Sequence, residues 1–359
     1  MNLININREL SFKYIYKIYI LIFQIIYLSL LYPFLINKKI GKTFYEKKSF
    51  SNTNKNNLES KIGYFEIDNV QPENYERQIL DQIKHRLKGN LLNPIHELYF
   101  INGLIRKYRP TKILEIGVCS GGVSATILNA IKDIDEAKLY SCDLEKKHYT
   151  NNDFNVGYVA RDNFPELLGR WKLYTGNTTA AFIEEIGGNI DFVFIDTAHV
   201  MPGEVLNVIE ILPFLKENAI IAFDDINYHM EIEKATKKYF HSCNNLLFSV
   251  LRGKKIIYNQ KNNVTFYNSK LGAIILDSNQ QNNFFEYFYL LSNNWSYMPN
   301  KFEIDKIREL IKKYYKPFFL SIFDKAVETN YRILKKQGLL KMDYILYTFK
   351  SKRKKPIYS

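Results

Sequence analysis

Short apolar runs alternate with amphipathic segments through the middle of the chain. Such runs, with few polar interruptions, are typical of strands that are buried on both faces of a parallel sheet. Between the runs, apolar residues three or four positions apart predict helices. The alternation predicts right-handed βαβ crossovers around an open sheet. The expected strands cover residues 112–117, 138–143, 191–196 and 219–224.

The pattern continues toward the C-terminus with a predicted helix at 231–240 and four further strand-like runs. These runs are expected to complete the sheet with an antiparallel edge, which gives an α/β fold class. From about residue 280 onward the spacing is helical and predicts a helical C-terminal extension. The strand-like runs are 246–251, 255–258, 264–267 and 271–276.

Residues 18–36 form an uncharged apolar stretch of 19 residues with lysines on both sides. As a helix, this stretch would be just long enough to cross a bilayer. Gln24, Ser29 and Pro33 weaken a spanning interpretation, and the tyrosine-rich ends suit a helix lying in the membrane interface equally well. The alternative is a helix packed on its own domain or on a partner. A cleaved signal peptide is less favoured, because no small-x-small site follows.

Three parts are expected along the chain. Residues 1–60 would hold the apolar helix and a polar linker, residues 61–277 the α/β domain, and residues 278–359 the helical extension with a basic tail. The tail contains the run SKRKK at 351–355, and such a run is usually only a solvated end. On the same chain as an apolar segment, it suggests contact with an anionic membrane surface.

The formal net charge of +13 comes from the two ends of the chain. Residues 1–60 contribute +6 and residues 333–359 contribute +7, so the body between them is neutral. A neutral body does not indicate a basic groove for a phosphate backbone, and no nucleic-acid partner is expected. The three cysteines form no C-x-x-C pair, which supports neither a disulfide framework nor a structural zinc site and favours a reducing compartment.

Four residues with special chemistry stand at the ends of expected strands: Gly117, Asp143, Asp196 and Asp224. In an open parallel sheet, ligands bind beyond the carboxyl ends of the strands, so these residues are expected along one rim. A single Asp after a strand is commonly a helix cap or a turn residue. Four such residues on one edge favour a binding site over packing.

The sequence EIGVCSGG, residues 115–122, follows the first of these strands and leads directly into a predicted helix. Its glycines allow positive φ and a close approach of a ligand to the backbone. The spacing G-x-x-x-G-G differs from the G-x-G-x-x-G of dinucleotide-binding folds and from a phosphate loop, so NAD and FAD are disfavoured. Asp143, at the end of the next strand, is placed to accept hydrogen bonds from a ribose diol.

This glycine-rich sequence and the acid of the next strand together resemble motif I and the ribose-binding acid of class I S-adenosylmethionine-dependent methyltransferases. The resemblance implies a Rossmann-like, doubly wound and mostly parallel sheet. It also implies that Glu115, Gly117 and Gly121 bind the methionine part of the cofactor. Asn177 would lie near the adenine, at a position where that family frequently has an acid.

A second group of candidates lies downstream. Asp196 is followed three residues later by His199, and Asp224 is followed directly by Asp225. Three carboxylates at adjacent strand ends repel one another unless a cation or a proton lies between them. An all-oxygen shell suits Mg²⁺, with Mn²⁺ or Ca²⁺ as alternatives. The interpretation without a metal is one buried capping acid beside a solvated one, with His199 as a turn residue.

This constellation resembles the metal-dependent O-methyltransferases of the catechol type and their relatives that methylate sugar hydroxyls on macrolides. The resemblance implies that Asp196, Asp224 and Asp225 are metal ligands. It also implies that His199 and Asp196 are catalytic, with His199 as the base that takes the proton of a hydroxyl bound to the cation. The turn Asp-Thr-Ala-His at 196–199 lacks the Asn/Asp-Pro-Pro-aromatic motif for exocyclic amines, which again disfavours nucleic acid.

The sequence therefore predicts an enzyme that moves a methyl group from S-adenosylmethionine to a hydroxyl of a sugar, glycolipid or other small molecule. Its catalytic domain would face the cytosol, with attachment to a membrane and homo-oligomer formation left open. One alternative is a metal-independent methyltransferase in which Asp196 and His199 act alone. The other is a non-catalytic, membrane-associated binding or scaffold protein that retains the fold.

Overall fold

The computed structural model describes residues 64–67, 95–149, 151–226, 247, 253–258, 271–276, 284–338 and 340. All of them belong to the compact unit Ile62–Ser359, and none to the unit Met1–Lys61. Several expected segments lie outside the described residues: the apolar stretch at 18–36, the linker, the helix at 231–240, the strand at 264–267 and the basic tail. Of the strand expected at 246–251, only Leu247 is described, and it is helical, so the strand prediction is wrong at that residue. Within the described part of the chain, no helix is both long and apolar enough to cross a membrane.

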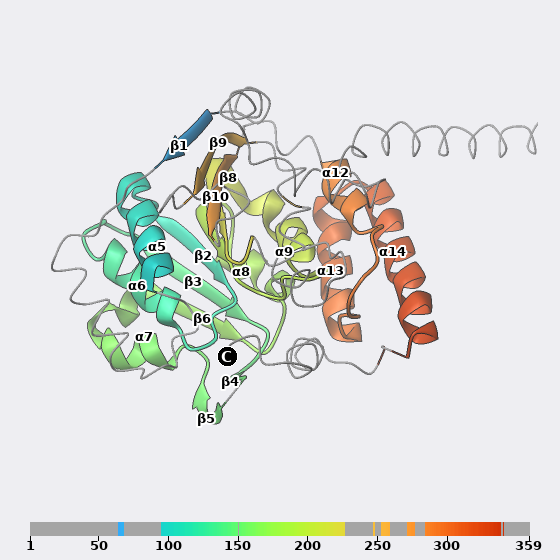
Figure 1. The fold of residues 1–359 in the computed structure, drawn as a ribbon, viewed down its shortest axis with the longest axis horizontal. Helices are drawn as coiled ribbons and strands as arrows, with labels where there is room; N and C mark the ends of the chain where they lie inside the picture. Colours follow the sequence, from blue (N-terminus) through green and yellow to red (C-terminus); the bar gives the residue numbers. More distant parts are fainter. Residues whose placement is uncertain are drawn as a thin grey trace, which may run out of the picture. The chain divides into compact units, whose positions relative to one another are not determined.

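The described strands form an eight-stranded central sheet (Figure 1). In spatial order they are β1 (Tyr64–Ile67), β9 (Gly253–Tyr258), β10 (Gly272–Leu276), β8 (Leu215–Phe223), β7 (Ile190–Ile195), β2 (Lys112–Ile116), β3 (Lys138–Asp143) and β6 (Trp171–Thr175). Neighbouring strands are parallel except at β10, which runs antiparallel to both β8 and β9. The predicted fold class, a Rossmann-like and mostly parallel sheet with antiparallel pairing toward one edge, is confirmed.

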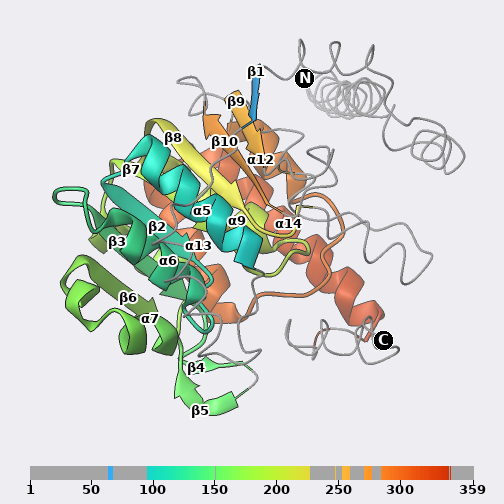
Figure 2. The same ribbon diagram turned by 60° about the vertical axis from the view of Figure 1, so that its left-hand side comes forward.

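Helices cover both faces of the sheet, as Figure 2 shows. They are α5 (Ile95–Tyr108), α6 (Gly122–Ile131), α7 (Tyr158–Asn163), α8 (Ile183–Ile186), α9 (Gly203–Ile211), α12 (Phe284–Leu290), α13 (Lys301–Tyr314) and α14 (Pro317–Lys336), with 3-10 turns at Pro165–Arg170, Thr179–Ala181 and Leu212–Phe214. Alternate residues of a strand point to opposite faces. Phe192 and Phe194 accordingly pack with α5, α6 and α7, whereas Val193 and Ile195 pack with α9 and the C-terminal helices.

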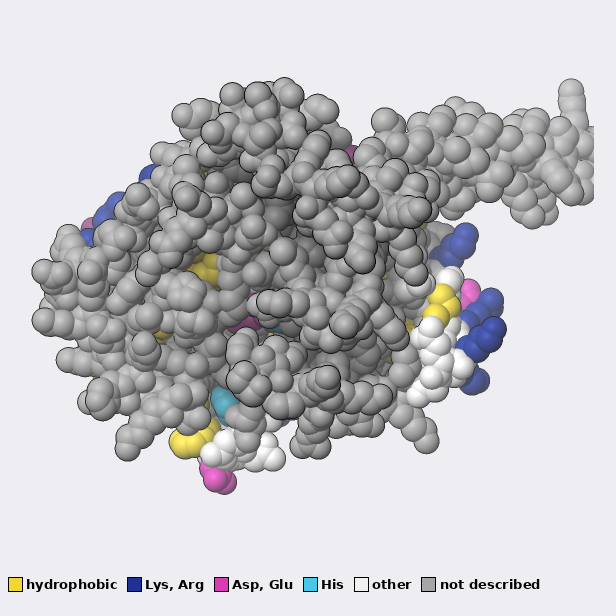
Figure 3. All heavy atoms as spheres, in the orientation of Figure 1, with side chains coloured by type: hydrophobic (Ala, Val, Ile, Leu, Met, Phe, Trp, Pro, Cys, Tyr) yellow, Lys and Arg dark blue, Asp and Glu magenta, His cyan; other side chains and the backbone are white. Residues whose placement is uncertain are grey.

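The helical C-terminal region predicted from about residue 280 is present, and it packs on α9. The hydroxyl of Tyr315 donates a hydrogen bond to the carbonyl of Ile209. A capping box begins α13, because Asn300 Oδ1 accepts from the Glu303 backbone at 3.0 Å and Glu303 Oε2 accepts from the Asn300 backbone at 2.9 Å. The apolar side of these helices thus joins the core, and Lys and Arg side chains gather on their outer side (Figure 3).

A small hairpin follows β3 and was not indicated by the apolar pattern. Its strands are β4 (Lys147–His148) and β5 (Asn151–Asn155), and all five residues of β5 are exposed. A strand with the sequence Asn-Asn-Asp-Phe-Asn lacks the alternation by which strands are recognised. After the hairpin the chain returns to the loop that follows β2, where Gly157 N donates to the Cys119 carbonyl at 2.9 Å.

Candidate functional site

Backbone hydrogen bonds tie the carboxyl ends of four parallel strands together. The Gly117 nitrogen donates to the end of β3 at 2.9 Å, the Asp196 nitrogen to the end of β2 at 2.9 Å, and the Asp224 nitrogen to the end of β7 at 3.0 Å. Asp143 is the last residue of β3. The structure therefore places Gly117, Asp143, Asp196 and Asp224 along one edge of the sheet, where ligands bind in open α/β folds.

The loop of residues 117–121, called the glycine loop below, needs glycine at both ends. Gly117 has φ +89°, and a Cβ atom there would lie 1.8 Å from the carbonyl oxygen of Asp196. Gly121 also has φ +89°, and its Cβ would lie 2.8 Å from the Cα atom of Gly157. A side chain at either position would meet backbone atoms, so these glycines let the glycine loop lie directly against β7 and the chain beyond the hairpin.

Asp143 holds the glycine loop in place. Its Oδ2 accepts hydrogen bonds from the backbone nitrogens of Val118 at 2.8 Å and Cys119 at 2.9 Å, and its Oδ1 accepts from the Glu145 nitrogen at 2.8 Å. The sequence suggested a ribose acceptor at this position. A carboxylate has about four lone-pair sites, so these three bonds leave it capacity for one more donor.

Asn177 lies at the same edge, in the turn after β6. Gly176 has φ +86°, and its nitrogen donates to the Asp143 carbonyl at 3.0 Å, which brings the turn beside the end of β3. The half-buried Asn177 side chain accepts from the Thr178 nitrogen at 2.9 Å. The amide thus organises its own turn next to Asp143.

Glu115 is fully buried beneath the glycine loop. Its Oε2 accepts hydrogen bonds from the hydroxyls of Ser124 and Ser141, both at 2.6 Å. Its Oε1 is buried without a hydrogen-bond partner in the described structure. Burial raises the pKa of Glu115 to about 7, although the two serine hydrogen bonds lower it; Asp143 and Asp196 add to the increase.

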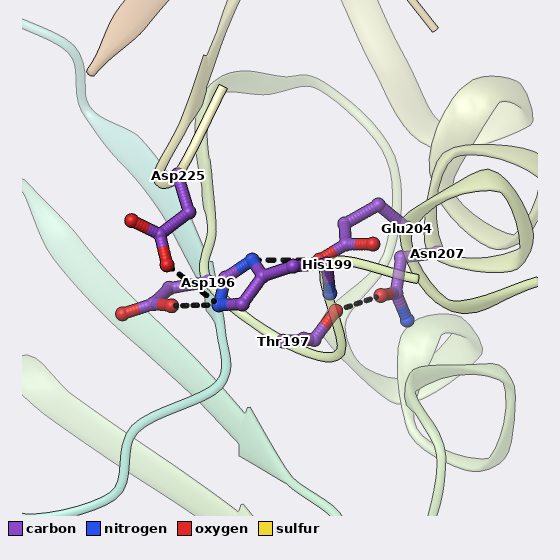
Figure 4. A network of polar contacts seen from close by, with 6 residues as sticks. All are labelled: Asp196, Thr197, His199, Glu204, Asn207 and Asp225. Atoms are coloured by element: carbon purple, nitrogen blue, oxygen red, sulfur yellow. Dashed lines mark hydrogen bonds and ion pairs between the residues drawn. The ribbon is translucent and has the colours of Figure 1, made fainter. Parts of the chain in front are cut away.

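The histidine cluster, formed by Asp196, His199, Glu204 and Asp225, is drawn in Figure 4. His199 Nε2 lies 3.4 Å from Asp196 Oδ1 and 3.5 Å from Asp225 Oδ2, so carboxylates from the ends of β7 and β8 meet at the same nitrogen. The three side chains are 13%, 24% and 17% exposed, in the order His199, Asp196 and Asp225, so the cluster is reachable from solvent.

Glu204, in the first turn of α9, belongs to this cluster although no pattern in the sequence singled it out. Its Oε1 accepts a hydrogen bond from the His199 backbone nitrogen at 2.6 Å and lies 3.2 Å from His199 Nδ1. The side chain is 0% exposed. An acid in the first turn of a helix ordinarily only favours the helix dipole, which is why this position gave no distinct signal.

The three carboxylates control the charge of His199. Burial lowers the pKa of His199, but Asp225, Glu204 and Asp196 together raise it to about 10. The neighbouring carboxylates therefore favour the imidazolium form of the ring. Neutralisation of these carboxylates would remove the cause of the increase and would favour the neutral, proton-accepting ring.

The predicted metal ligands are only partly brought together. Asp196 and Asp225 converge and offer the carboxylate oxygens that a hard divalent cation binds. Asp224 is buried, with 3% of its surface exposed, and the His199 ring lies where the other two carboxylates meet. Among the described residues, no group of three or more His, Cys, Asp and Glu side chains is arranged to hold a metal ion. The donor chemistry of Asp196 and Asp225 suits a cation, but the site is not preformed as a metal centre.

Comparison with known families finds one match over this region. Residues 114–226 match the family model described as a methyltransferase domain. The matched range contains the glycine loop, Asp143, Asn177 and the whole histidine cluster. No curated protein matches the chain.

Several solved structures resemble the fold. The O-methyltransferase TomG from Streptomyces achromogenes, involved in tomaymycin synthesis and solved with SAM, is 14% identical, with 63% of this chain and 96% of that chain covered and a TM-score of 0.41. An O-methyltransferase from Bacillus cereus in complex with SAH is 14% identical. The match covers 61% of this chain and 96% of that chain, with a TM-score of 0.40. A putative caffeoyl-CoA O-methyltransferase from Staphylococcus aureus is 20% identical. The match covers 43% of this chain and 69% of that chain, with a TM-score of 0.34.

Proposed function

We propose, from the premise that residues 114–226 form a methyltransferase domain on a class I fold, that the protein methylates a hydroxyl group with S-adenosylmethionine as the donor. The observation that carries the proposal is the position of His199 Nε2, which faces the carboxylates of Asp196 and Asp225 at the carboxyl edge of the sheet. The acceptor that we propose is a sugar, a glycolipid or another small molecule.

The glycine-loop half of the edge would hold the donor. Glu115 Oε1 is a buried acceptor without a partner in the described structure, which suits the ammonium group of the methionine part. Gly117 and Gly121 would let a ligand approach the backbone of the glycine loop, and Asp143 and Asn177 would bind the ribose and adenine side. When bound, S-adenosylmethionine supplies an electrophilic methyl group on a sulfonium.

The histidine half of the edge would act on the acceptor. His199 accepts the hydroxyl proton at Nε2 while the acceptor oxygen forms its bond to the methyl carbon and the sulfur–carbon bond breaks. The products are a methyl ether, S-adenosylhomocysteine and a proton that His199 passes to solvent. A positioned general base typically contributes about 10²–10⁴-fold to the rate.

A divalent cation, with Mg²⁺ favoured, would be held by Asp196, Asp225 and Asp224. Such a cation would polarise the acceptor oxygen and lower the pKa of its hydroxyl. The closeness of the Asp196 and Asp225 carboxylates, which share a contact with His199 Nε2, supports this part of the proposal. The same charge would offset the carboxylates that raise the pKa of His199, and it would thereby favour the neutral ring that a base requires.

A metal-independent reaction is a second candidate, and a separate observation favours it. The His199 ring already lies between Asp196 and Asp225, and its positive charge neutralises them without an added ion. In this version, the charged His199 ring orients Asp196, and the Asp196 carboxylate receives the proton of the acceptor hydroxyl. Chelation distinguishes the two versions, because it would abolish turnover in the first and leave it unchanged in the second.

Calorimetric titration of the full chain with S-adenosylmethionine and S-adenosylhomocysteine, each in Mg²⁺ and in EDTA, tests the proposal. We expect micromolar binding of both ligands, followed by transfer of a labelled methyl group to one of a panel of methyl glycosides and catechol. Binding without transfer to any hydroxyl would contradict the acceptor class. No binding to folded protein would contradict the enzyme itself and favour a non-catalytic module that retains the fold.

A further inference from the structure

We propose that Glu204 is a positioning residue that fixes the ring of His199 in its working orientation, an inference that rests on the proposed function. A single atom, Glu204 Oε1, contacts two nitrogens of the same residue. It accepts from the His199 backbone nitrogen at 2.6 Å and lies 3.2 Å from Nδ1 of the ring. A contact to both backbone and ring constrains the rotation of the side chain between them.

The constraint determines which nitrogen faces the reaction. The two ring nitrogens of an imidazole lie on different sides of the ring, so a ring whose Nδ1 lies beside Glu204 Oε1 directs Nε2 away from it. Nε2 indeed lies 3.4 Å from Asp196 Oδ1 and 3.5 Å from Asp225 Oδ2, while Nδ1 faces Glu204, as Figure 4 shows. With Nδ1 on the Glu204 side, Nε2 is the ring nitrogen left to face the acceptor.

The backbone around Glu204 places its side chain beside His199. Glu204 lies in the first turn of α9, next to Gly203, where a Cβ would lie 2.6 Å from the Cβ of Ala198. Helix and loop are therefore in direct contact. His199 itself has φ +57°, which costs a residue with a side chain roughly 1–2 kcal/mol. The hydrogen bond from its nitrogen to Glu204 favours this conformation.

The second oxygen of Glu204 distinguishes this carboxylate from one that only fills space. Oε2 is buried and has no hydrogen-bond partner in the described structure. A buried carboxylate with an unsatisfied oxygen lowers stability, and a neutral or apolar side chain at this position would avoid that cost. A carboxylate that costs stability at an active site is expected to have a functional reason. The contact of Glu204 with the backbone nitrogen and with Nδ1 of His199 provides one.

Glu210 offers a matched control on the same helix. It is also buried, at 1% exposure, but it accepts from the Thr178 hydroxyl at 2.7 Å and the Ala180 nitrogen at 3.1 Å, away from the His199 ring. Replacement of either glutamate by glutamine removes one buried carboxylate from α9 and keeps an acceptor oxygen. Only the change at Glu204 alters the partner of Nδ1.

The test compares Glu204→Gln with Glu210→Gln in the full chain by proton and nitrogen NMR of the histidine rings, with His199→Gln to assign the signal. We expect a downfield Nδ1 proton signal of His199 that moves upfield in Glu204→Gln and stays in Glu210→Gln. Turnover of a methyl glycoside or catechol is expected to fall about 10–100-fold in Glu204→Gln, with S-adenosylhomocysteine affinity within about twofold.

Two outcomes would overturn the inference. The first is an unchanged His199 signal in folded Glu204→Gln, which decides the matter even if the wild-type chain methylates none of the probes and the proposed function fails. The second is an equal loss of turnover in both glutamine variants, which would indicate a general loss of stability. If Glu204→Gln does not fold, Glu204→Asp replaces it, and the shorter carboxylate is expected to weaken the Nδ1 contact and to lower turnover by a smaller factor.

Discussion

The glycine loop and the histidine cluster lie on the same edge of the sheet, but different kinds of contact hold them. Backbone atoms build the glycine loop: its amides donate to Asp143, and Gly117 leaves no room for a side chain beside Asp196. Charged side chains from the ends of two strands and from α9 build the histidine cluster. A site made of backbone depends on conformation, whereas a site made of side chains depends on charge and orientation.

Substitution at the boundary between the two regions should have the largest effect. In Gly117→Ala, the new methyl group would overlap the Asp196 carbonyl at a φ of +89°. We expect the free energy of unfolding to fall by on the order of 3 kcal/mol, together with loss of S-adenosylhomocysteine binding. Urea denaturation and calorimetry measure the two effects.

Gly169→Ala is the matched control, because no heavy atom lies within 4 Å of a Cβ at that position. We expect it to change the unfolding free energy by less than about 0.5 kcal/mol. Equal stability of the two variants would show that the close approach of the glycine loop to β7 does not constrain the fold.

The histidine cluster can be disrupted without disturbing the glycine loop. We expect His199→Ala to lower kcat by about 10²–10⁴-fold, because the proton of the acceptor hydroxyl would lose its receiving group. The affinity for S-adenosylhomocysteine should stay within about threefold of wild type, since the contacts of Asp143 with the glycine loop do not involve the ring. A parallel loss of cofactor affinity and kcat would mean that the two regions are not separable.

Asp143→Asn tests the opposite region. The variant keeps one acceptor oxygen but loses the charge that binds the nitrogens of Val118 and Cys119. Hydrogen bonds to charged groups contribute about 1.5–3 kcal/mol, so we expect cofactor affinity to fall by about 10–100-fold while kcat at saturation stays within about threefold. The exposed Asp153 of the hairpin provides the control substitution Asp153→Asn, which should leave affinity unchanged.

The smallest expected effect concerns pH and the buried Glu115. Its folded pKa of about 7 lies above the ordinary 4.5, so the folded chain binds the proton more tightly, and this group's contribution to stability is lost as pH rises from about 4.5 through 7. A glutamine at this position stays neutral at every pH, so the variant does not lose stability as the pH rises. We expect Glu115→Gln to melt several degrees above wild type at pH 8 and close to it at pH 5.

Glu217, which is exposed on β8, gives the control for this pH effect. Glu217→Gln should have the same melting temperature as wild type at both pH 5 and pH 8, because burial does not disfavour the charged form of an exposed carboxylate. A Glu115→Gln variant whose melting temperature differs from wild type by the same amount at pH 5 and pH 8 would contradict the assignment of the pH dependence to this carboxyl.

The sequence by itself determined the four central parallel strands and their order along the chain. Periodicity is local, so the runs ending at Gly117, Asp143, Asp196 and Asp224 could be recognised as parallel strands, and their ends could be placed on one edge from topology alone. The glycine loop was also evident, because a tight strand-to-helix turn with positive φ favours glycine over every residue that has a side chain.

Only the tertiary structure decided which side chains meet. Glu204 gave no signal because its contact with His199 depends on the path of a loop and on side-chain rotation, neither of which leaves a periodic pattern. The anchoring of the glycine loop by Asp143 likewise required two turns to approach within hydrogen-bond distance. Local periodicity sets where elements begin and end, whereas close packing of residues far apart in the sequence determines the chemistry between them.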